Sequence, residues 1–196
     1  MKNMTATSWL NIWQTPEYLE KKEKAFNIVD SYLTGLSVIP NCILDIGCGL
    51  AFETEFFQKK YNSEIFLLDD DFDNNIETQN RDVFFGPANT LKFYSNLNDL
   101  FNSYKQRNLR YNFIYAKNPV IKQDIKFDLI YSNRSYGFHY PIETYIDLIK
   151  NHSNKDTIVI LDLWKETYTE QIAKCNLVKV LEDGEQHYKV HVNFQH

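Results

Sequence analysis

Two aspartates and two glycines in the first half of the chain have a spacing that could hold a ligand. The apolar run 43–46 contains Asp45 and leads into Gly47 and Gly49, after which 51–61 has a helical pattern. A glycine turn between a strand and a helix lets a ligand approach the backbone closely. Asp69 ends the next apolar run, 24 residues after Asp45, where a carboxylate commonly binds the hydroxyls of a ribose. The spacing favours a nucleoside site over a turn that serves only to connect strand and helix.

A second group of chemically versatile residues, 132–141, follows the apolar run 127–131. His139 is the natural general base for a hydroxyl group, because the unperturbed pKa of histidine is about 6.5. Arg134 could bind an anionic group of a substrate, and Tyr136 and Tyr140 could shape the pocket. The alternative is that His139 only packs between Phe138 and Tyr140 and hydrogen-bonds to the backbone.

The remaining candidates for chemistry favour plain structural roles. His187 and His191 are predicted to lie on an exposed strand face rather than to bind a metal, and His152 and His196 are predicted to be solvated. The acidic run 69–71 is expected to be a solvated loop, because consecutive side chains cannot all face one cation. Three cysteines without a CxxC spacing argue against a disulfide scaffold or a zinc site. No metal site is therefore predicted.

Alternating strand and helix patterns must position these residues. Thr15 and Pro16 predict the start of a helix that ends at Gly35. Further helices are predicted at 51–61, 97–104, 142–149 and 166–174. Strands are predicted at 43–46, 65–68, 112–115, 127–131, 157–163, 177–181 and 187–194. This order predicts an α/β, Rossmann-like, seven-stranded, mostly parallel sheet with helices on both faces and an antiparallel C-terminal hairpin.

Composition limits the possible functions. The 196 residues carry 26 acidic and 21 basic side chains, a net charge of -5, and no basic block, which argues against a nucleic-acid partner. No apolar run approaches the roughly 18 residues that span a bilayer, so a soluble, cytoplasmic protein without a membrane partner is expected. We expect one domain, 1–196, with an N-terminal helical cap region at 1–36 and a Rossmann-like core at 40–194. The oligomeric state is not predicted.

Three segments resemble a known family. Leu44 to Gly49 resembles the first motif, LDIGCGxG, of class I S-adenosylmethionine-dependent methyltransferases, and 65–69 resembles their second motif. The run 127–132 resembles their fourth-strand motif, and the strand count matches their sheet. The third glycine of the first motif is Ala51 here. Phe52 stands where a dinucleotide GxGxxG motif has its last glycine, which favours the phosphate-free methyl donor over NAD.

The resemblance assigns residues to S-adenosylmethionine and its product S-adenosylhomocysteine. Asp45, Gly47 and Gly49 would surround the methionine part, Asp69 would bind the ribose, and Asp70 would lie near the adenine. The full set of implied cofactor-binding residues is Asp45, Gly47, Cys48, Gly49, Asp69, Asp70, Ala116, Lys117 and Ser132. Lys117 departs from the many relatives that have an acid there. The run 133–136 resembles the Asn-Pro-Pro-Tyr motif of amino-group methyltransferases only weakly, because both prolines are absent.

These observations predict a methyltransferase that acts on a small polar molecule, most simply on a hydroxyl of a sugar or metabolite. The predicted catalytic residues are His139, Tyr140 and Arg134. Segments around 84–97 and 135–141 resemble putative methyltransferases of sugars, which favours that substrate class. Trp9, Trp13 and the segment 72–92 are expected to close over the cofactor. The alternatives are an NAD-linked oxidoreductase on the same sheet and a non-catalytic module that binds a nucleoside cofactor.

Overall fold

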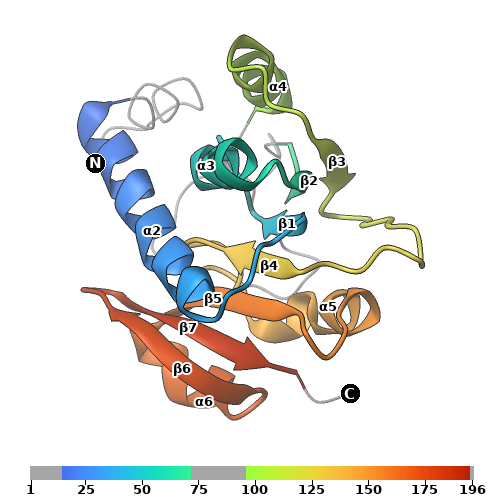
Figure 1. Ribbon diagram of the computed structural model, residues 1–196. Helices are drawn as coiled ribbons and strands as arrows, with labels where there is room; N and C mark the ends of the chain where they lie inside the picture. The colour runs from blue at the N-terminus through green and yellow to red at the C-terminus, as the bar shows by residue number, and fades with distance from the viewer. Residues whose placement is uncertain (1–14, 72–95, 195–196) are drawn as a thin grey trace, which may run out of the picture.

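The computed structural model describes residues 15–71 and 96–194. The seven strands in these segments form one sheet in the order β3-β2-β1-β4-β5-β7-β6 (Figure 1). Strands β1 to β5 run parallel to one another, whereas β7 runs antiparallel to both β5 and β6. The chain moves outward from β1 through β2 to β3 and then returns to β4. The predicted fold class is therefore confirmed.

The elements follow the predicted order closely. The strands are β1 (Cys42–Ile46), β2 (Glu64–Asp69), β3 (Asn112–Tyr115), β4 (Leu129–Ser132), β5 (Ile158–Trp164), β6 (Asn176–Asp183) and β7 (His187–Asn193). The α-helices are α2 (Pro16–Gly35), α3 (Phe52–Tyr61), α4 (Leu97–Gln106), α5 (Ile146–His152) and α6 (Tyr168–Ile172). The predicted helices 142–149 and 166–174 each begin as a short 3-10 turn, η2 (Ile142–Thr144) and η3 (Lys165–Thr167).

Apolar side chains cover both faces of the sheet. One core joins side chains of α2, α3 and α4 to one face, with Val29, Leu33 and Phe57 fully buried. The other core joins η2 and α5 to the opposite face through Ile142 and Ile149. Strands with two covered faces read as continuous apolar runs, which is why 43–46 and 65–68 show little alternation.

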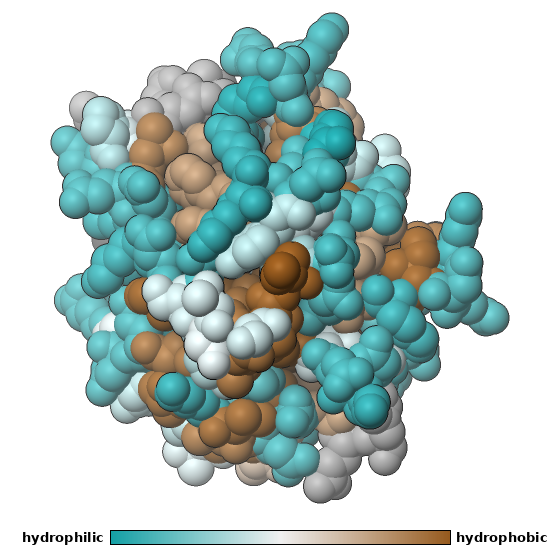
Figure 2. Space-filling view, in the orientation of Figure 1, coloured by the Kyte–Doolittle hydropathy of each residue, from teal (hydrophilic) through white to brown (hydrophobic). Residues whose placement is uncertain are grey.

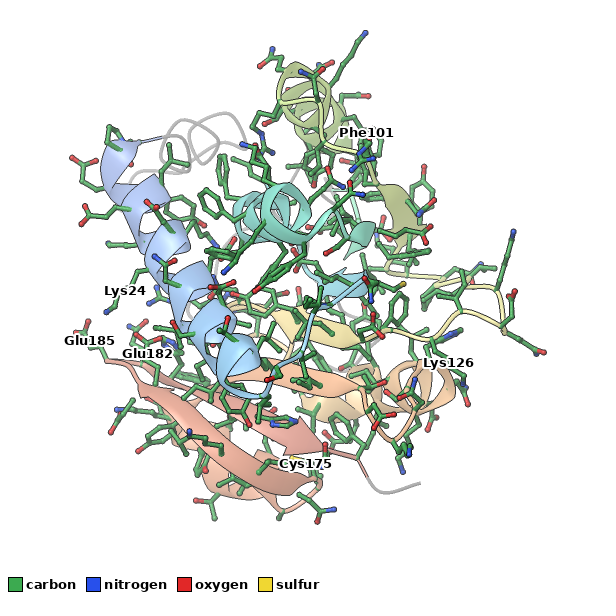
Figure 3. All side chains as sticks on the ribbon, in the orientation of Figure 1. Lys24, Phe101, Lys126, Cys175, Glu182 and Glu185 are labelled. Atoms are coloured by element: carbon green, nitrogen blue, oxygen red, sulfur yellow. The ribbon has the colours of Figure 1, made fainter. Side chains whose placement is uncertain are left out.

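Helix α2 begins and ends where the sequence predicts. The Thr15 side chain accepts a hydrogen bond from the Tyr18 amide, Pro16 takes the first position, and the helix ends at Gly35. Nζ of Lys24 in α2 lies 3.6 Å from Oε1 of Glu182 in β6, so the helix contacts the edge strand of the sheet (Figure 3). Figure 2 shows apolar surface over the part of this face where β6 lies, and Leu177, Val178 and Val180 are its exposed apolar side chains.

Three predictions about histidines are wrong. His187 and His191 are 4% and 7% exposed, because His191 lies against Tyr32 of α2 and His187 lies against the Phe138 ring. His152 is also buried, and its Nδ1 lies 2.9 Å from the Ile125 carbonyl. His196, Trp9, Trp13 and the segment 72–92 lie outside the described residues. None of the helices in the described part of the chain is long and apolar enough to cross a bilayer.

Candidate active site

The turn after β1 brings the predicted glycines and Asp69 together. The Gly47 amide donates to the Leu68 carbonyl of β2 over 2.7 Å, and the Gly49 amide donates to Asp69 Oδ2 over 2.8 Å. Both glycines have positive φ angles, +70° and +49°. The ends of β1 and β2 are thereby linked through a carboxylate. The structure thus brings the glycine turn and Asp69 together.

The expectation of a solvated loop at 69–71 is wrong for Asp69 and Asp70, which are both buried. The Asp69 carboxylate lies in a largely dry environment. It is 5% exposed, and burial raises its pKa to about 6, although the bonds from the Asp70 and Gly49 amides lower it. Oδ1 accepts the Asp70 amide over 2.8 Å. Since each carboxylate oxygen has two acceptor positions, Oδ1 can accept one further hydrogen bond, such as one from a hydroxyl.

Asp45 is buried beside the same turn and is hydrogen-bonded by the Thr54 hydroxyl of α3. Burial raises the pKa of Asp45 to about 7, the Thr54 bond lowers it, and the charge of Glu53 raises it. The group therefore titrates near neutral pH. A cationic ligand group placed beside it would favour the carboxylate form.

Helix α4 fixes the turn from the other side. The Tyr104 hydroxyl donates to the Gly49 carbonyl and lies 3.5 Å from Cys48 Sγ. Arg107 donates to the Leu50 carbonyl and pairs with Glu55. Sequence reasoning missed both residues, because their contacts bridge more than 50 positions and no local pattern marks them.

The residues assigned to adenine binding lie together beside Asp69. The Lys117 amide donates to Asp70 Oδ2 over 2.9 Å, and the Ala116 amide donates to the Asp69 carbonyl over 2.9 Å. Ala116 is buried, and its carbonyl accepts the Tyr145 hydroxyl over 3.2 Å. The ends of β2 and β3 thus present Asp70, Ala116 and Lys117 as one group.

Ser132 and the residues after it connect β4 to the glycine turn. Ser132 is fully buried; its hydroxyl donates to the Ile46 carbonyl over 2.9 Å and accepts the Tyr136 amide over 2.9 Å. The Ser135 side chain lies against Gly47, where a Cβ would be 1.8 Å from Ser135 Oγ. Glycine is therefore needed at position 47, because the Ser135 side chain occupies the space that a Cβ would take.

The three predicted catalytic residues have different surroundings. Arg134 is exposed at a φ of +53°, and its amide donates to Asp162 over 3.0 Å. Tyr140 is buried, and its carbonyl accepts the Gly137 amide over 2.8 Å. His139 is half-buried, and burial lowers its pKa to about 4. His139 is thus uncharged at neutral pH but a weaker base than the sequence predicts.

A polar cluster that sequence reasoning missed lies beside Asp45. Nζ of Lys22 in α2 is 2.9 Å from Glu53 Oε1, and the side-chain nitrogen of Asn133 donates to the same oxygen. Glu53 is only 3% exposed. The one sequence signal was an acidic residue early in α3, which is also expected of any helix start, so it did not single out Glu53.

The residues present fit a nucleoside ligand at Gly49 and Asp69. No described atom lies within 4 Å of the position that a Cβ of Gly49 would take, so the backbone there is open to a ligand. Asp69 retains acceptor capacity, and the methionine end predicted at Asp45 has opposite charges nearby in Lys22 and Glu53. Among the described residues, no group of three or more histidine, cysteine or acidic side chains could hold a metal ion.

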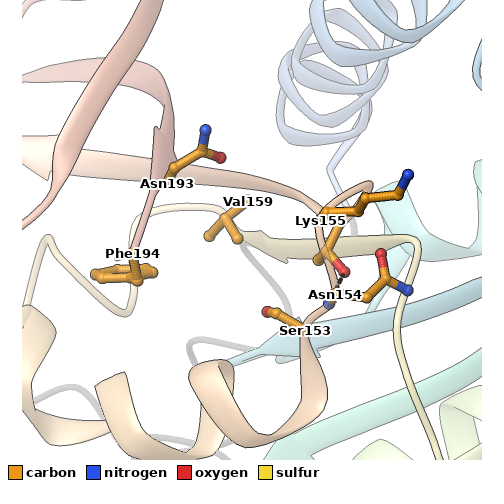
Figure 4. A pocket seen from close by; sticks show the side chains of 7 residues that line it. Ser153, Asn154, Lys155, Val159, Asn193 and Phe194 are labelled. Carbon is orange, nitrogen blue, oxygen red and sulfur yellow. Dashed lines mark hydrogen bonds between the residues drawn. The ribbon is translucent and has the colours of Figure 1, made fainter. Parts of the chain in front are cut away.

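A shallow pocket elsewhere is unrelated to this site. It is lined by Ser153, Asn154, Lys155, Thr157, Val159, Asn193 and Phe194 (Figure 4). These residues lie at the start of β5 and the end of β7, whereas the glycine turn faces the opposite ends of the parallel strands. In open α/β sheets, ligands bind outside the carboxyl ends of the strands, so this pocket lies away from the expected ligand-binding edge.

Solved structures share this fold. The PH0226 protein of Pyrococcus horikoshii OT3 is 11% identical, the match covers 93% of each chain, and the TM-score is 0.60. An S-adenosylmethionine-dependent methyltransferase of Clostridium acetobutylicum ATCC 824 is 14% identical over 97% of this chain and 81% of that one, with a TM-score of 0.53. Comparison with protein-family models gives no match, and neither does comparison with curated proteins.

A third structure was solved with ligands. The plantazolicin methyltransferase BpumL, in complex with a pentazolic desmethylPZN analog and S-adenosylhomocysteine, is 17% identical, with a TM-score of 0.54. The match covers 86% of this chain and 56% of BpumL, so this chain spans about half of that protein. Together with the strand order, these likenesses establish the Rossmann-like fold that S-adenosylmethionine-dependent methyltransferases share.

Proposed function

We propose that this chain is an S-adenosylmethionine-dependent methyltransferase that acts on a small polar molecule, most simply by O-methylation of a sugar or metabolite hydroxyl. The observation that carries the proposal is the hydrogen bond between the Gly49 amide and Asp69 at the adjoining ends of β1 and β2. It holds the carboxylate that we propose to bind the ribose against the turn at Gly49, whose backbone is open. The solved methyltransferases with this fold support the same reading.

The residues of the chain divide the work along the carboxyl edge of the sheet. Asp69 binds the ribose, Asp70, Ala116 and Lys117 frame the adenine, and Gly47, Cys48, Gly49 and Asp45 surround the methionine end. S-adenosylmethionine supplies an electrophilic methyl group when bound. Ser132 holds the segment after β4 against β1, which positions Arg134, His139 and Tyr140 toward the acceptor. His139, neutral at physiological pH, takes the proton of the acceptor hydroxyl.

Calorimetric titration with S-adenosylhomocysteine and with NADH tests the cofactor assignment. We expect S-adenosylhomocysteine to bind and NADH not to bind. Asp69→Asn should weaken binding of S-adenosylhomocysteine at least tenfold, because it replaces the anion that accepts the ribose hydroxyls. The matched control is Asp156→Asn, which changes an exposed acid at the other end of the sheet. Binding of NADH instead would favour the oxidoreductase and overturn the proposal.

Turnover separates an enzyme from a binding module. The purified protein is incubated with S-adenosylmethionine and a panel of sugars and hydroxylated metabolites, and release of S-adenosylhomocysteine is measured. Tight binding of S-adenosylhomocysteine without turnover on any acceptor, small or macromolecular, would favour the non-catalytic module. Turnover only on a peptide or RNA would overturn the substrate class.

A further inference from the structure

Lys22, Glu53 and Asn133 form a compact polar cluster at the sheet edge. Lys22 Nζ and the Asn133 side-chain nitrogen both bind Glu53 Oε1. The Lys22 and Glu53 side chains are only 16% and 4% exposed. The three residues come from α2, from the first turn of α3 and from the segment after β4, so the fold and not the local sequence assembles them.

The cluster lies at the point where the strand order reverses. The chain proceeds from β1 to β2 and β3 on one side and returns to β4 on the other side of β1. Ligands of open α/β sheets bind at this reversal. Asp69 and Asp70 follow β2, whereas Asn133 follows β4. If the ribose of a ligand lies at Asp69, the ligand therefore extends across the glycine turn, and its other end lies toward the cluster of Lys22, Glu53 and Asn133.

The charges of the cluster suit a group that carries both signs. Glu53 uses one of its two oxygens for Lys22 and Asn133, and the Lys22 ammonium has two N–H groups beyond the one that faces Glu53. Burial lowers the pKa of Lys22, but the charge of Glu53 and the hydrogen bond to it outweigh this effect, so the pKa of Lys22 is raised and the ammonium persists. A zwitterion can bind here without leaving a buried charge unpaired.

We propose that Lys22 and Glu53 bind the α-amino acid end of the cofactor. The Lys22 ammonium binds the carboxylate of the ligand, and the Glu53 carboxylate binds the ammonium of the ligand. The pair thereby distinguishes a nucleoside that carries an amino acid from one that does not. This inference rests on the proposed function, and it adds a residue of α2 that lies outside every motif on which the family resemblance depends. It also makes α2 a part of the binding site itself.

Two probes separate the ends of the ligand. S-adenosylhomocysteine carries the amino acid, whereas 5′-methylthioadenosine has the same adenine and ribose and ends in a methyl group. Lys22→Met should weaken binding of S-adenosylhomocysteine at least tenfold and change binding of 5′-methylthioadenosine less than twofold in calorimetry. Asp69→Asn should weaken both. The matched control is Lys21→Met, which removes the neighbouring exposed charge of the same helix and should weaken neither.

Further variants protect the test from misfolding. Lys22→Met leaves Glu53 without its cation, so Lys22→Met with Glu53→Gln removes both charges, and Lys22→Arg should retain most of the affinity for S-adenosylhomocysteine. Equal effects of Lys22→Met and of the double variant on both probes, or no effect of these two variants on either probe, would overturn the inference while leaving the proposed function intact. If neither probe binds the unaltered protein, the proposed function fails and the inference fails with it.

Discussion

Asp162 of β5 and Lys189 of β7 form an ion pair directly across the antiparallel strands, with Lys189 Nζ 2.5 Å from Asp162 Oδ1. Both side chains are buried, at 0% and 1% exposure. The other oxygen of Asp162 accepts the Arg134 amide. The pair therefore connects β5 and β7 to the segment after β4 that contains Arg134 and is proposed to face the acceptor.

Removing one partner of this pair should destabilise the protein strongly. Lys189→Met leaves Asp162 as an unpaired buried charge, and we expect a loss of about 3–5 kcal/mol in the free energy of unfolding. Lys189→Met with Asp162→Asn should lose less, because the amide oxygen can still accept from Arg134 without a charge. Lys155→Met in the exposed turn before β5 is the control, with an expected change within about 0.5 kcal/mol. Urea denaturation measures all three; equal losses for the single and double variants would contradict this account.

The titration of Asp45 predicts how the stability of the ligand-free protein depends on pH. Burial above all raises its folded-state pKa to about 7, whereas the unfolded value is about 3.9. The folded protein then binds more protons than the unfolded one between these values, so stability falls as pH rises from about 4 to about 7. Asp45→Asn removes this loss while its amide oxygen still accepts the Thr54 hydroxyl.

We therefore expect Asp45→Asn to gain in melting temperature relative to the unaltered protein as the pH is raised from 5 to 8. Thermal unfolding at three pH values measures the difference. Asp156→Asn should show a difference that does not change with pH. A gain for Asp45→Asn that shrinks toward pH 8 would show that the carboxylate, rather than the carboxylic acid, is the form favoured in the folded protein.

The sequence predicts the fold well because the fold depends on local patterns. Thr15 and Pro16 begin α2 by capping chemistry, whereas the C-cap is Leu36 and the left-handed residue after it is Ser37 rather than the predicted Gly35. The apolar runs that become β1 and β2 are followed by Gly47 and Asp70, which are typical of turns. Both the glycine turn and Asp69 follow from the strand–turn–helix arrangement. Predictions on these residues needed no knowledge of distant contacts.

The failures concern contacts between elements far apart in the chain. His191 looks like an exposed residue of a C-terminal strand, yet its Nδ1 lies 2.8 Å from the Tyr32 hydroxyl of α2, 159 positions away. Lys22 looks like a solvated lysine among others on a charged helix, yet it pairs with Glu53. Only the crossing of α2 over the sheet makes these partners neighbours, and no periodicity encodes that crossing.

The support of the glycine turn by α4 can be tested at Tyr104. This ring is fully buried, and its hydroxyl donates to the Gly49 carbonyl. Tyr104→Phe keeps the ring but leaves the carbonyl unsatisfied, which should cost about 1–3 kcal/mol of stability and weaken binding of S-adenosylhomocysteine several-fold. Tyr111→Phe alters a partly buried ring of the same aromatic cluster and is the control. Unchanged affinity in Tyr104→Phe would mean that the turn holds its shape without α4.

The role of His139 can be separated from cofactor binding. His139→Ala should lower the rate of methyl transfer at least about 100-fold, the contribution of a positioned general base, while binding of S-adenosylhomocysteine stays nearly unchanged. Because burial lowers the His139 pKa to about 4, the imidazole is neutral above that pH. The rate should then show no inflection near pH 6.5 from this group and should fall only as the pH approaches 4. An inflection near 6.5 that disappears in His139→Ala would mean that the histidine is more solvated during turnover than in this structure. A variant with an unchanged rate would leave His139 as a packing residue between Phe138 and Tyr140.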